Sequence, residues 1–280
     1  MIEQKLSVPV SVIIPCYACG NTIERALASV WRQTWRPAEA IVVDDASPDD
    51  TRVILERLTH IYGSDWLKII CHTQNRGAGA ARNTGWDAAT QPYIAFLDSD
   101  DSWNPRKIEI QLGYMLKHRD LDFSAHRYRI ELGEGNGQIM VASKPSTRPI
   151  CASLLLIRNF IATPTVMVRK DIQLRFPERR FSEDYLLWLE MSLGSFKGMF
   201  IEYELTSLHK APYGSKGLSA ELWQMELGEL QTYFQLHREG YISGIILASL
   251  VPFSLIKYVR RVVRTVLVGR HCCEIIQEEK

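Results

Sequence analysis

The first hundred residues alternate short apolar segments with segments of helical spacing, and this alternation limits the possible folds more than any other feature. The apolar segments are rich in Val and Ile and predict buried strands. An alternating order of strands and helices predicts an α/β fold, with a mostly parallel central sheet flanked by helices and right-handed crossovers. The predicted strands cover residues 8–16, 40–43, 67–71 and 93–98, and the predicted helices cover residues 21–35, 48–61 and 78–89.

Carboxylates follow two of the predicted strands at the point where each strand ends. Asp44 and Asp45 end the second strand, and Asp98, Asp100 and Asp101 end the fourth. Ligands of parallel sheets bind outside the carboxyl ends of the strands, so these residues predict a site. Three negative charges within four residues are costly without a cation, and Mg²⁺ and Mn²⁺ prefer carboxylate oxygens. Taken alone, each acidic segment also suits an ordinary solvated turn.

Small residues and two arginines open the third predicted helix. Gly77 and Gly79 allow the backbone to approach a ligand closely, and Arg76 and Arg82 add positive charge where a helix N-terminus already attracts anions. The segment lacks the third glycine of a dinucleotide-binding fingerprint and the G-K-S/T of a P-loop. It therefore predicts an anion site of neither of these types.

Composition adds a few limits. The chain has 280 residues and a formal net charge of +1, which gives no indication of a nucleic-acid partner. Cys16 and Cys19 form a C-x-x-C, but no second pair with metal-ligand spacing follows. We therefore expect reduced thiols in a cytoplasmic protein, not a zinc or redox site. The polar N-terminus shows no secretory signal peptide.

The middle of the chain is less regular. Residues 120–149 contain several glycines and prolines and predict a hairpin followed by a loop. Residues 161–168 and 200–205 predict further strands. Ser182 is the expected N-cap of an apolar helix whose first turn carries Glu183 and Asp184. Because a helix N-terminus favours an anion, we expect Asp184 to stay ionised.

From residue 218 the pattern is helical only, which predicts a domain at 1–217 and a C-terminal helical extension at 218–280. Residues 241–256 carry no charge, and Lys257, Arg260, Arg261, Arg264 and Arg270 follow without an acidic residue among them. The uncharged segment is shorter than the ~20 residues that span a bilayer. It predicts a helix lying on an anionic membrane surface, with packing on protein as the alternative.

Several segments together resemble glycosyltransferase family 2, a family of inverting enzymes with the GT-A fold, in its bacterial cell-surface polysaccharide type. The agreement in order and spacing extends over about the first 110 residues. Residues 182–184 resemble the family's E-D motif, and residues 210–219 resemble the loop that closes over the donor. One departure is Ala18, where family members commonly have Asn. The matching N-terminal segments are residues 10–17, 29–34, 42–47, 75–83 and 96–101.

The resemblance implies a role for each matching residue. Asp184 is the expected catalytic base for the acceptor hydroxyl, and Asp100 the expected ligand of a Mn²⁺ or Mg²⁺ ion that bridges the donor diphosphate. Asp98 is expected to bond the ribose or assist the metal. His209 is either a further metal ligand or a solvent-facing loop residue. The other expected nucleotide-binding residues are Pro15 and Tyr17 in the pocket wall, Asp45 on the base, and Arg76 and Arg82.

The implied activity is metal-dependent transfer of a sugar from a nucleoside-diphosphate donor to a hydroxyl of a cell-surface glycan or lipid-linked acceptor. The expected location is the cytoplasm, peripheral to the inner face of the cell membrane. A sugar nucleotidyltransferase would carry a Gly-rich signature after the first strand, where Pro15-Cys16-Tyr17 stands. A processive polysaccharide synthase would carry Q-x-x-R-W and several membrane spans. A non-catalytic nucleotide-sugar-binding scaffold would not need the full carboxylate set.

Overall fold

A computed structural model describes residues 6–131, 146–210 and 221–278. The chain divides into two compact units, residues 1–210 and 211–280. The domain boundary predicted at 217 lies outside the described residues, as does the predicted donor loop after Lys210.

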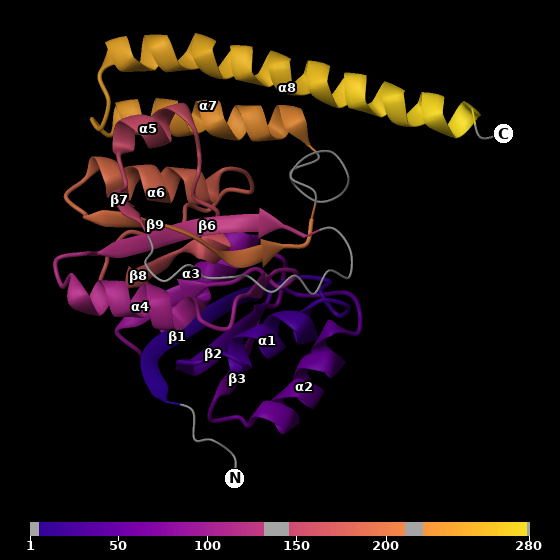
Figure 1. The fold of residues 1–280 in the computed structure, drawn as a ribbon, viewed down its shortest axis with the longest axis vertical. Helices are drawn as coiled ribbons and strands as arrows, with labels where there is room; N and C mark the ends of the chain where they lie inside the picture. The colour runs from indigo at the N-terminus through magenta and orange to yellow at the C-terminus, as the bar shows by residue number, and fades with distance from the viewer. Residues whose placement is uncertain (1–5, 132–145, 211–220, 279–280) are drawn as a thin grey trace. The chain divides into compact units, whose positions relative to one another are not determined.

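The first half of the larger unit has the predicted alternation of strands and helices (Figure 1). Its four strands lie in the order β3-β2-β1-β4 and pair in parallel throughout. The prediction of a parallel α/β sheet is therefore confirmed for this part of the chain. The strands are β1 (Ser7–Cys16), β2 (Arg36–Asp44), β3 (Leu67–Cys71) and β4 (Tyr93–Phe96), and the helices are α1 (Ile23–Trp31), α2 (Thr51–Tyr62) and α3 (Ala78–Ala88).

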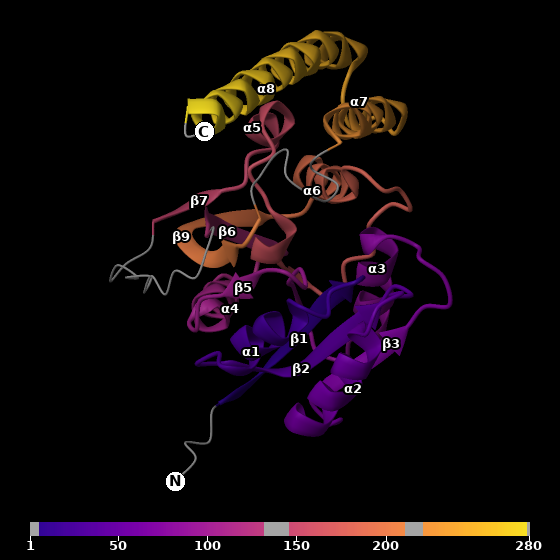
Figure 2. The ribbon, with the colours of Figure 1, turned by 90° about the vertical axis from the view of Figure 1, so that its right-hand side faces the viewer.

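Alternate residues of β1 point to opposite faces of the sheet, as a strand period of two requires. Val12 and Ile14 belong to one core cluster with Leu27 of α1 and Leu55 of α2. On the other face, Ile13 lies against α3, and Figure 2 shows α1 and α3 on opposite sides of β1. The parallel sheet is thus buried on both faces, which explains its nearly continuous apolar strands.

The second half of the sheet is mixed in direction. It continues from β4 in the order β8-β6-β9-β5, and β7 also pairs with β9. Helix α4 belongs to the same apolar cluster as α1 and α2. The elements are β5 (Ser102–Trp103), α4 (Lys107–Lys117), β6 (Phe123–Ile130), β7 (Thr147–Pro149), α5 (Ala152–Ile157), η1 (Thr163–Thr165), β8 (Met167–Arg169), α6 (Glu183–Leu193) and β9 (Gly198–Leu208).

Two predictions for this half are wrong. The described strands β6 and β7 do not form a hairpin, because each pairs with β9 instead. The strand predicted at 161–168 is interrupted by the 3₁₀ turn η1, where Pro164 has no N–H to give to a sheet. Only Met167–Arg169 forms a strand there, antiparallel to β4 and β6.

The smaller unit consists of α7 (Leu222–Arg238) and α8 (Gly244–Glu278). The two helices run antiparallel (Figure 1), with the Trp223 ring 5.5 Å from the Tyr258 ring. Ser254 donates a hydrogen bond to Glu226 at 2.8 Å, and Lys257 pairs with Glu229. In the described part of the chain, no helix is long and apolar enough to cross a membrane.

Candidate functional site

The loop after β1 is held in a closed turn. Cys16 and Cys19 form a disulfide, so the prediction of two free thiols is wrong. Ala18 has a φ of 49°, a left-handed conformation that turns the chain back and brings the two cysteine Cα atoms to 5.9 Å. Pro15 is buried at the strand end, whereas Tyr17 is 51 % exposed. The turn therefore presents the Tyr17 ring at the carboxyl edge of the sheet.

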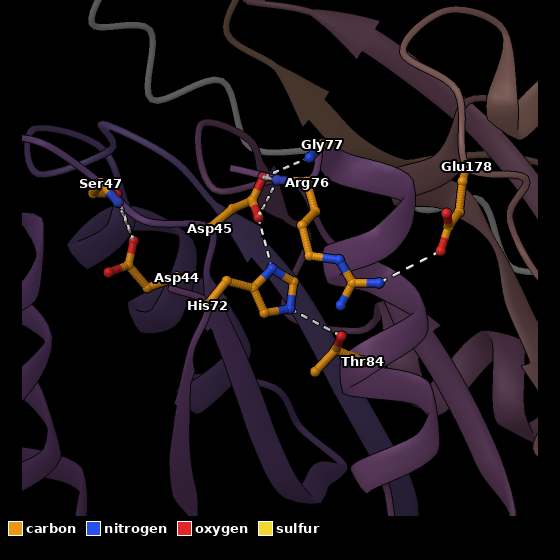
Figure 3. Close-up of polar contacts among 8 residues, drawn as sticks. All are labelled: Asp44, Asp45, Ser47, His72, Arg76, Gly77, Thr84 and Glu178. Atoms are coloured by element: carbon orange, nitrogen blue, oxygen red, sulfur yellow. Dashed lines mark hydrogen bonds and ion pairs between the residues drawn. The ribbon is translucent and has the colours of Figure 1, made fainter. Parts of the chain in front are cut away.

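Asp44 and Asp45 at the end of β2 have different partners (Figure 3). Asp44 accepts hydrogen bonds from the backbone N–H and the hydroxyl of Ser47, a local turn contact. Asp45 accepts from His72 Nδ1 at 2.6 Å and from the backbone N–H groups of Arg76 and Gly77 at 2.9 and 2.7 Å. Asp45 thus links the ends of β2 and β3 to the start of α3.

Gly77 permits this arrangement of the α3 N-terminus. Its φ of +88° is a conformation that L side chains rarely adopt, so a glycine is needed where the loop turns into the helix. The side chain of Arg76 extends from this turn and is half exposed, 3.4 Å from Glu178. Arg76 therefore offers a cation at a helix N-terminus, as the sequence predicts.

Arg82 joins two parts of the chain that are about a hundred residues apart. This buried guanidinium lies 2.8 Å from Asp98 at the end of β4 and 3.1 Å from Glu183 at the start of α6. Burial alone would lower the pKa of Arg82, but the carboxylates of Asp98 and Glu183 raise it. Arg82 is therefore a permanent cation between two carboxylate groups.

Glu183 and Asp184 begin α6 after Ser182, which is the N-cap residue but makes no side-chain cap hydrogen bond. Burial, together with Asp184, raises the pKa of Glu183 to about 7. Asp184 accepts hydrogen bonds from the hydroxyl of Thr163 at 3.1 Å and the N–H of Tyr185 at 2.7 Å. Burial nevertheless raises the pKa of Asp184, against the effect expected from the helix N-terminus, and its ionisation stays a prediction.

The cluster after β4 concentrates negative charge. Burial, with Asp98 and Asp100 close by, raises the pKa of Asp101 to about 8. Lys210 forms an ion pair with Asp100. His209 Nε2 lies 2.8 Å from the Ser102 hydroxyl, so this nitrogen already has a hydrogen-bond partner.

Among the described residues, no three His, Cys, Asp or Glu side chains converge as a metal site. Burial and then the charges of Asp98 and Asp100 raise the pKa of Asp101. The acidic donor set still fits a hard divalent cation, because an added positive charge would offset the repulsion among these carboxyl groups. Asp100 and the neighbouring aspartates in the same turn supply these carboxylate oxygens, and Lys210 now pairs with Asp100.

Comparison with known proteins assigns the family. Residues 11–173 match the family model of Glycosyl transferase family 2, which is more than half of the chain. The chain belongs to glycosyltransferase family 2. It is 34 % identical over 185 residues to "UDP-Glc:alpha-D-GlcNAc-diphosphoundecaprenol beta-1,3-glucosyltransferase WfgD" of Escherichia coli, covering 65 % of this chain and 69 % of WfgD. It is 33 % identical to the putative teichuronic acid biosynthesis glycosyltransferase TuaG of Bacillus subtilis, covering 65 % and 71 %.

Solved structures agree on the fold. S. aureus TarS in complex with UDP-GlcNAc superposes with a TM-score of 0.67 at 20 % identity, covering 89 % of this chain and 72 % of the TarS chain. The mannosyltransferase PcManGT of Pyrobaculum calidifontis gives a TM-score of 0.62 at 15 % identity, covering 95 % and 79 %. The predicted GT-A fold is thus confirmed, and this family 2 chain is a glycosyltransferase.

Two polar residues of this glycosyltransferase carry no sequence signal. His72 is a single histidine after a strand, and Thr84 is one of several polar residues in α3. The contacts of His72 with Thr84 and with Asp45 depend on how β3 and α3 pack. Glu183 had a signal in the E-D motif, but its bond to Arg82 becomes visible only in the folded chain.

Proposed function

We propose that this glycosyltransferase moves a sugar from a nucleoside-diphosphate donor to an acceptor hydroxyl with inversion at the anomeric carbon. One observation supports the proposal above the others. The Arg82 guanidinium pairs with two carboxylates at once, those of Asp98 and Glu183. Asp98 follows β4, and Glu183 directly precedes Asp184. The residue proposed to contact the sugar donor and the residue proposed as general base are thereby kept within one site.

The donor's nucleotide lies at the ends of β1 and β2 in this proposal. The exposed Tyr17 ring and Pro15 line the pocket, Asp45 accepts a hydrogen bond from the base, and Asp98 bonds the ribose or assists the metal. Arg76 and Arg82 contribute positive charge toward the diphosphate. UDP-GlcNAc bound to TarS and the UDP-Glc in the name of WfgD favour a uridine donor.

A Mn²⁺ or Mg²⁺ ion would be held by Asp100, with the neighbouring carboxylates completing the acidic donor set. Bound there, the ion would neutralise charge on the departing diphosphate. Lys210 would have to leave Asp100 for the ion to bind, since both use the same carboxylate. His209 would have to leave Ser102 before it could add a nitrogen ligand.

Asp184 acts as the general base in this proposal. Because burial raises its pKa, the carboxylate is a stronger base than an exposed aspartate, which favours proton removal from the acceptor hydroxyl. Thr163 and the N–H of Tyr185 fix the orientation of the carboxylate. One base on the face opposite the leaving group gives inversion, as in inverting glycoside hydrolysis.

The experiment that tests this function is a thermal-shift series with UDP, GDP, dTDP and CMP, each with and without Mn²⁺. A nucleotide at 100 times its Kd should add ~2.7 kcal/mol to the free energy of unfolding. We expect one diphosphate to stabilise the wild type in a Mn²⁺-dependent way. Asp100→Ala should abolish that dependence, and the exposed control Asp65→Ala should keep it. No stabilisation by any nucleotide would count against a nucleoside-diphosphate donor site in this protein.

The acceptor proposed is a cell-surface glycan or a lipid-linked glycan presented at the inner face of the cell membrane. The undecaprenol-linked acceptor in the WfgD name and the teichuronic acid in the TuaG name support this class. Helix α8 supports membrane contact, since Ile245, Ile256 and Val259 are 81, 66 and 58 % exposed. Arg260 is also exposed on this helix. Such an exposed apolar and basic helix fits an anionic lipid surface.

Vesicle cosedimentation of the full chain tests the membrane contact. We expect binding to vesicles that contain phosphatidylglycerol and little binding to pure phosphatidylcholine. The double variant Ile256→Ser, Val259→Ser should reduce the bound fraction several-fold, whereas Val53→Ser, an equally exposed apolar residue of α2, should not. Equal binding by both variants would favour packing of α8 on protein.

A further inference from the structure

Both ring nitrogens of His72 lie within 3 Å of other side chains. It follows β3 directly, and its side chain is 8 % exposed. Nδ1 lies 2.6 Å from Asp45 Oδ1, and Nε2 lies 2.9 Å from the hydroxyl of Thr84 (Figure 3). The imidazole therefore connects the carboxylate that ends β2 with a hydroxyl in α3.

We propose that His72 and Thr84 are positioning residues that aim the Asp45 carboxylate at the imide N–H of the donor's nucleobase, and so set the base preference. The inference rests on the proposed function, in which Asp45 contacts the base.

The direction of the hydrogen bonds follows from the acceptors available. Asp45 is a carboxylate and accepts, so His72 Nδ1 carries the proton of this bond. In neutral imidazole the other nitrogen is then an acceptor, and the Thr84 hydroxyl donates to it. This assignment of the tautomer comes from the hydrogen-bond network. Thr84 thus fixes the ring, and the ring fixes Asp45.

The number of donors around Asp45 limits what a ligand can offer. A carboxylate has about four lone-pair sites. His72 Nδ1 and the N–H groups of Arg76 and Gly77 are three donors, and the Arg76 N–H is shared between both oxygens. Room remains for about one further donor, and Asp45 is only 2 % exposed. A base that offers one N–H toward a fixed acceptor fits this limit.

Uracil meets the requirement with its N3–H, whereas cytosine has an unprotonated N3 at the same place and would set a lone pair against the carboxylate. The discrimination depends on the carboxylate staying in place. Without His72, Oδ1 loses its shortest contact and can turn away from the base, while the backbone contacts of Arg76 and Gly77 still let the loop fold. We therefore expect a protein without His72 to fold but to lose much of its preference between nucleobases.

The test measures Kd for UDP and for CDP by calorimetry with Mn²⁺ present, in full-length protein. We expect the wild type to bind UDP about tenfold or more tightly than CDP, in line with one hydrogen bond to a charged group. His72→Leu should bring the two affinities within about threefold. His72→Asn, whose amide can replace the Nδ1–H donor, should restore most of the preference. Thr84→Val should reduce it less than His72→Leu, and Thr84→Ser should keep it.

A purely structural role would lower thermal stability without changing the ratio of the two affinities. His60→Leu, an exposed histidine of α2, is the matched control and should leave the ratio unchanged. A wild-type preference that survives in His72→Leu but is lost in Asp45→Asn would overturn the inference and leave the proposed function intact. Equal binding of UDP and CDP by the wild type would also overturn it.

Binding of no nucleotide at all would instead remove the proposed function on which the inference rests. If His72→Leu does not fold, the Asn variant and the two Thr84 variants decide the outcome.

Discussion

The two ends of the candidate site differ in how their charges are compensated. At the end of β2, the Asp45 carboxylate accepts hydrogen bonds from one side chain and two backbone N–H groups. At the end of β4, burial, with Asp98 and Asp100 close by, raises the pKa of Asp101 to about 8. At the first end most acceptor sites of the carboxylate are already used, whereas at the second end three carboxyl groups share the cations Arg82 and Lys210.

This difference separates two tasks of a nucleotide-sugar site. A base is recognised by groups that are already fixed, since fixed acceptors discriminate between donor patterns. A diphosphate and a cation bring their own charges, so a cluster left partly uncompensated gains most from binding them. Arg82 connects the acidic end to Glu183 and Asp184 at the start of α6, where the acceptor hydroxyl is proposed to be activated.

The largest expected effect comes from removing the proposed general base, Asp184. Asp184→Asn keeps the size of the side chain and a hydrogen-bond acceptor for Thr163, but it cannot take a proton. Transfer should fall by about 10²–10⁴-fold, whereas the Kd for UDP with Mn²⁺ should change less than threefold. Single-turnover kinetics and calorimetry measure the two quantities. The exposed Asp171→Asn is the control. Normal turnover in Asp184→Asn would show that another residue is the general base, and Glu183 would be the next candidate to test.

The acidic end should also make stability depend on pH in a particular direction. The pKa of Asp101 is raised from 3.8 to about 8, so the folded protein keeps a proton that the unfolded chain releases. The free energy of unfolding therefore falls as pH rises from about 4 to about 8. Each 1 kcal/mol lost lowers Tm by about 2–4 °C in a domain of this size, and we expect at least that loss.

The measurement is Tm against pH for the wild type and for Asp101→Asn. The variant lacks the titrating group and should show a flatter profile, with higher Tm than the wild type at pH 8. The exposed control Asp65→Asn should follow the wild type. Identical slopes in Asp101→Asn and the wild type would show that the charge of this cluster is already compensated.

Local apolar patterns in the sequence were enough to predict the parallel part of the fold. β3 has the predicted bounds, and β1 and α3 differ from theirs by one residue. Local pattern could not predict that β6 and β7 each pair with β9, because β9 lies far along the chain. Neither the interrupted strand before β8 nor the disulfide after β1 follows from local pattern, since both depend on a backbone turn.

The candidate site divides in a similar manner. Motif spacing pointed to Asp45, Asp100 and Asp184, whose assigned roles stay predictions. The raised pKa of Asp184 was missed, because burial by the rest of the fold outweighs the helix N-terminus. His72 was missed because one histidine after a strand has no pattern, and its partner Thr84 is brought to it only by the packing of α3.

The last effect concerns the packing beneath the Asp45 end of the site. A Cβ added at Gly85 of α3 would lie 2.5 Å from Cγ2 of Ile13 in β1, and a β-branched strand residue has little freedom to move aside. Gly85→Ala should therefore cost about 1–3 kcal/mol and lower Tm by several degrees. Gly113→Ala in α4 is the matched control, because nothing lies within 4 Å of its added Cβ. That substitution should raise Tm slightly through helix propensity. If Gly85→Ala also raises Tm, then α3 can shift away from β1, and the hydrogen bonds that reach Asp45 from this helix are less rigid than the contrast between the two ends requires.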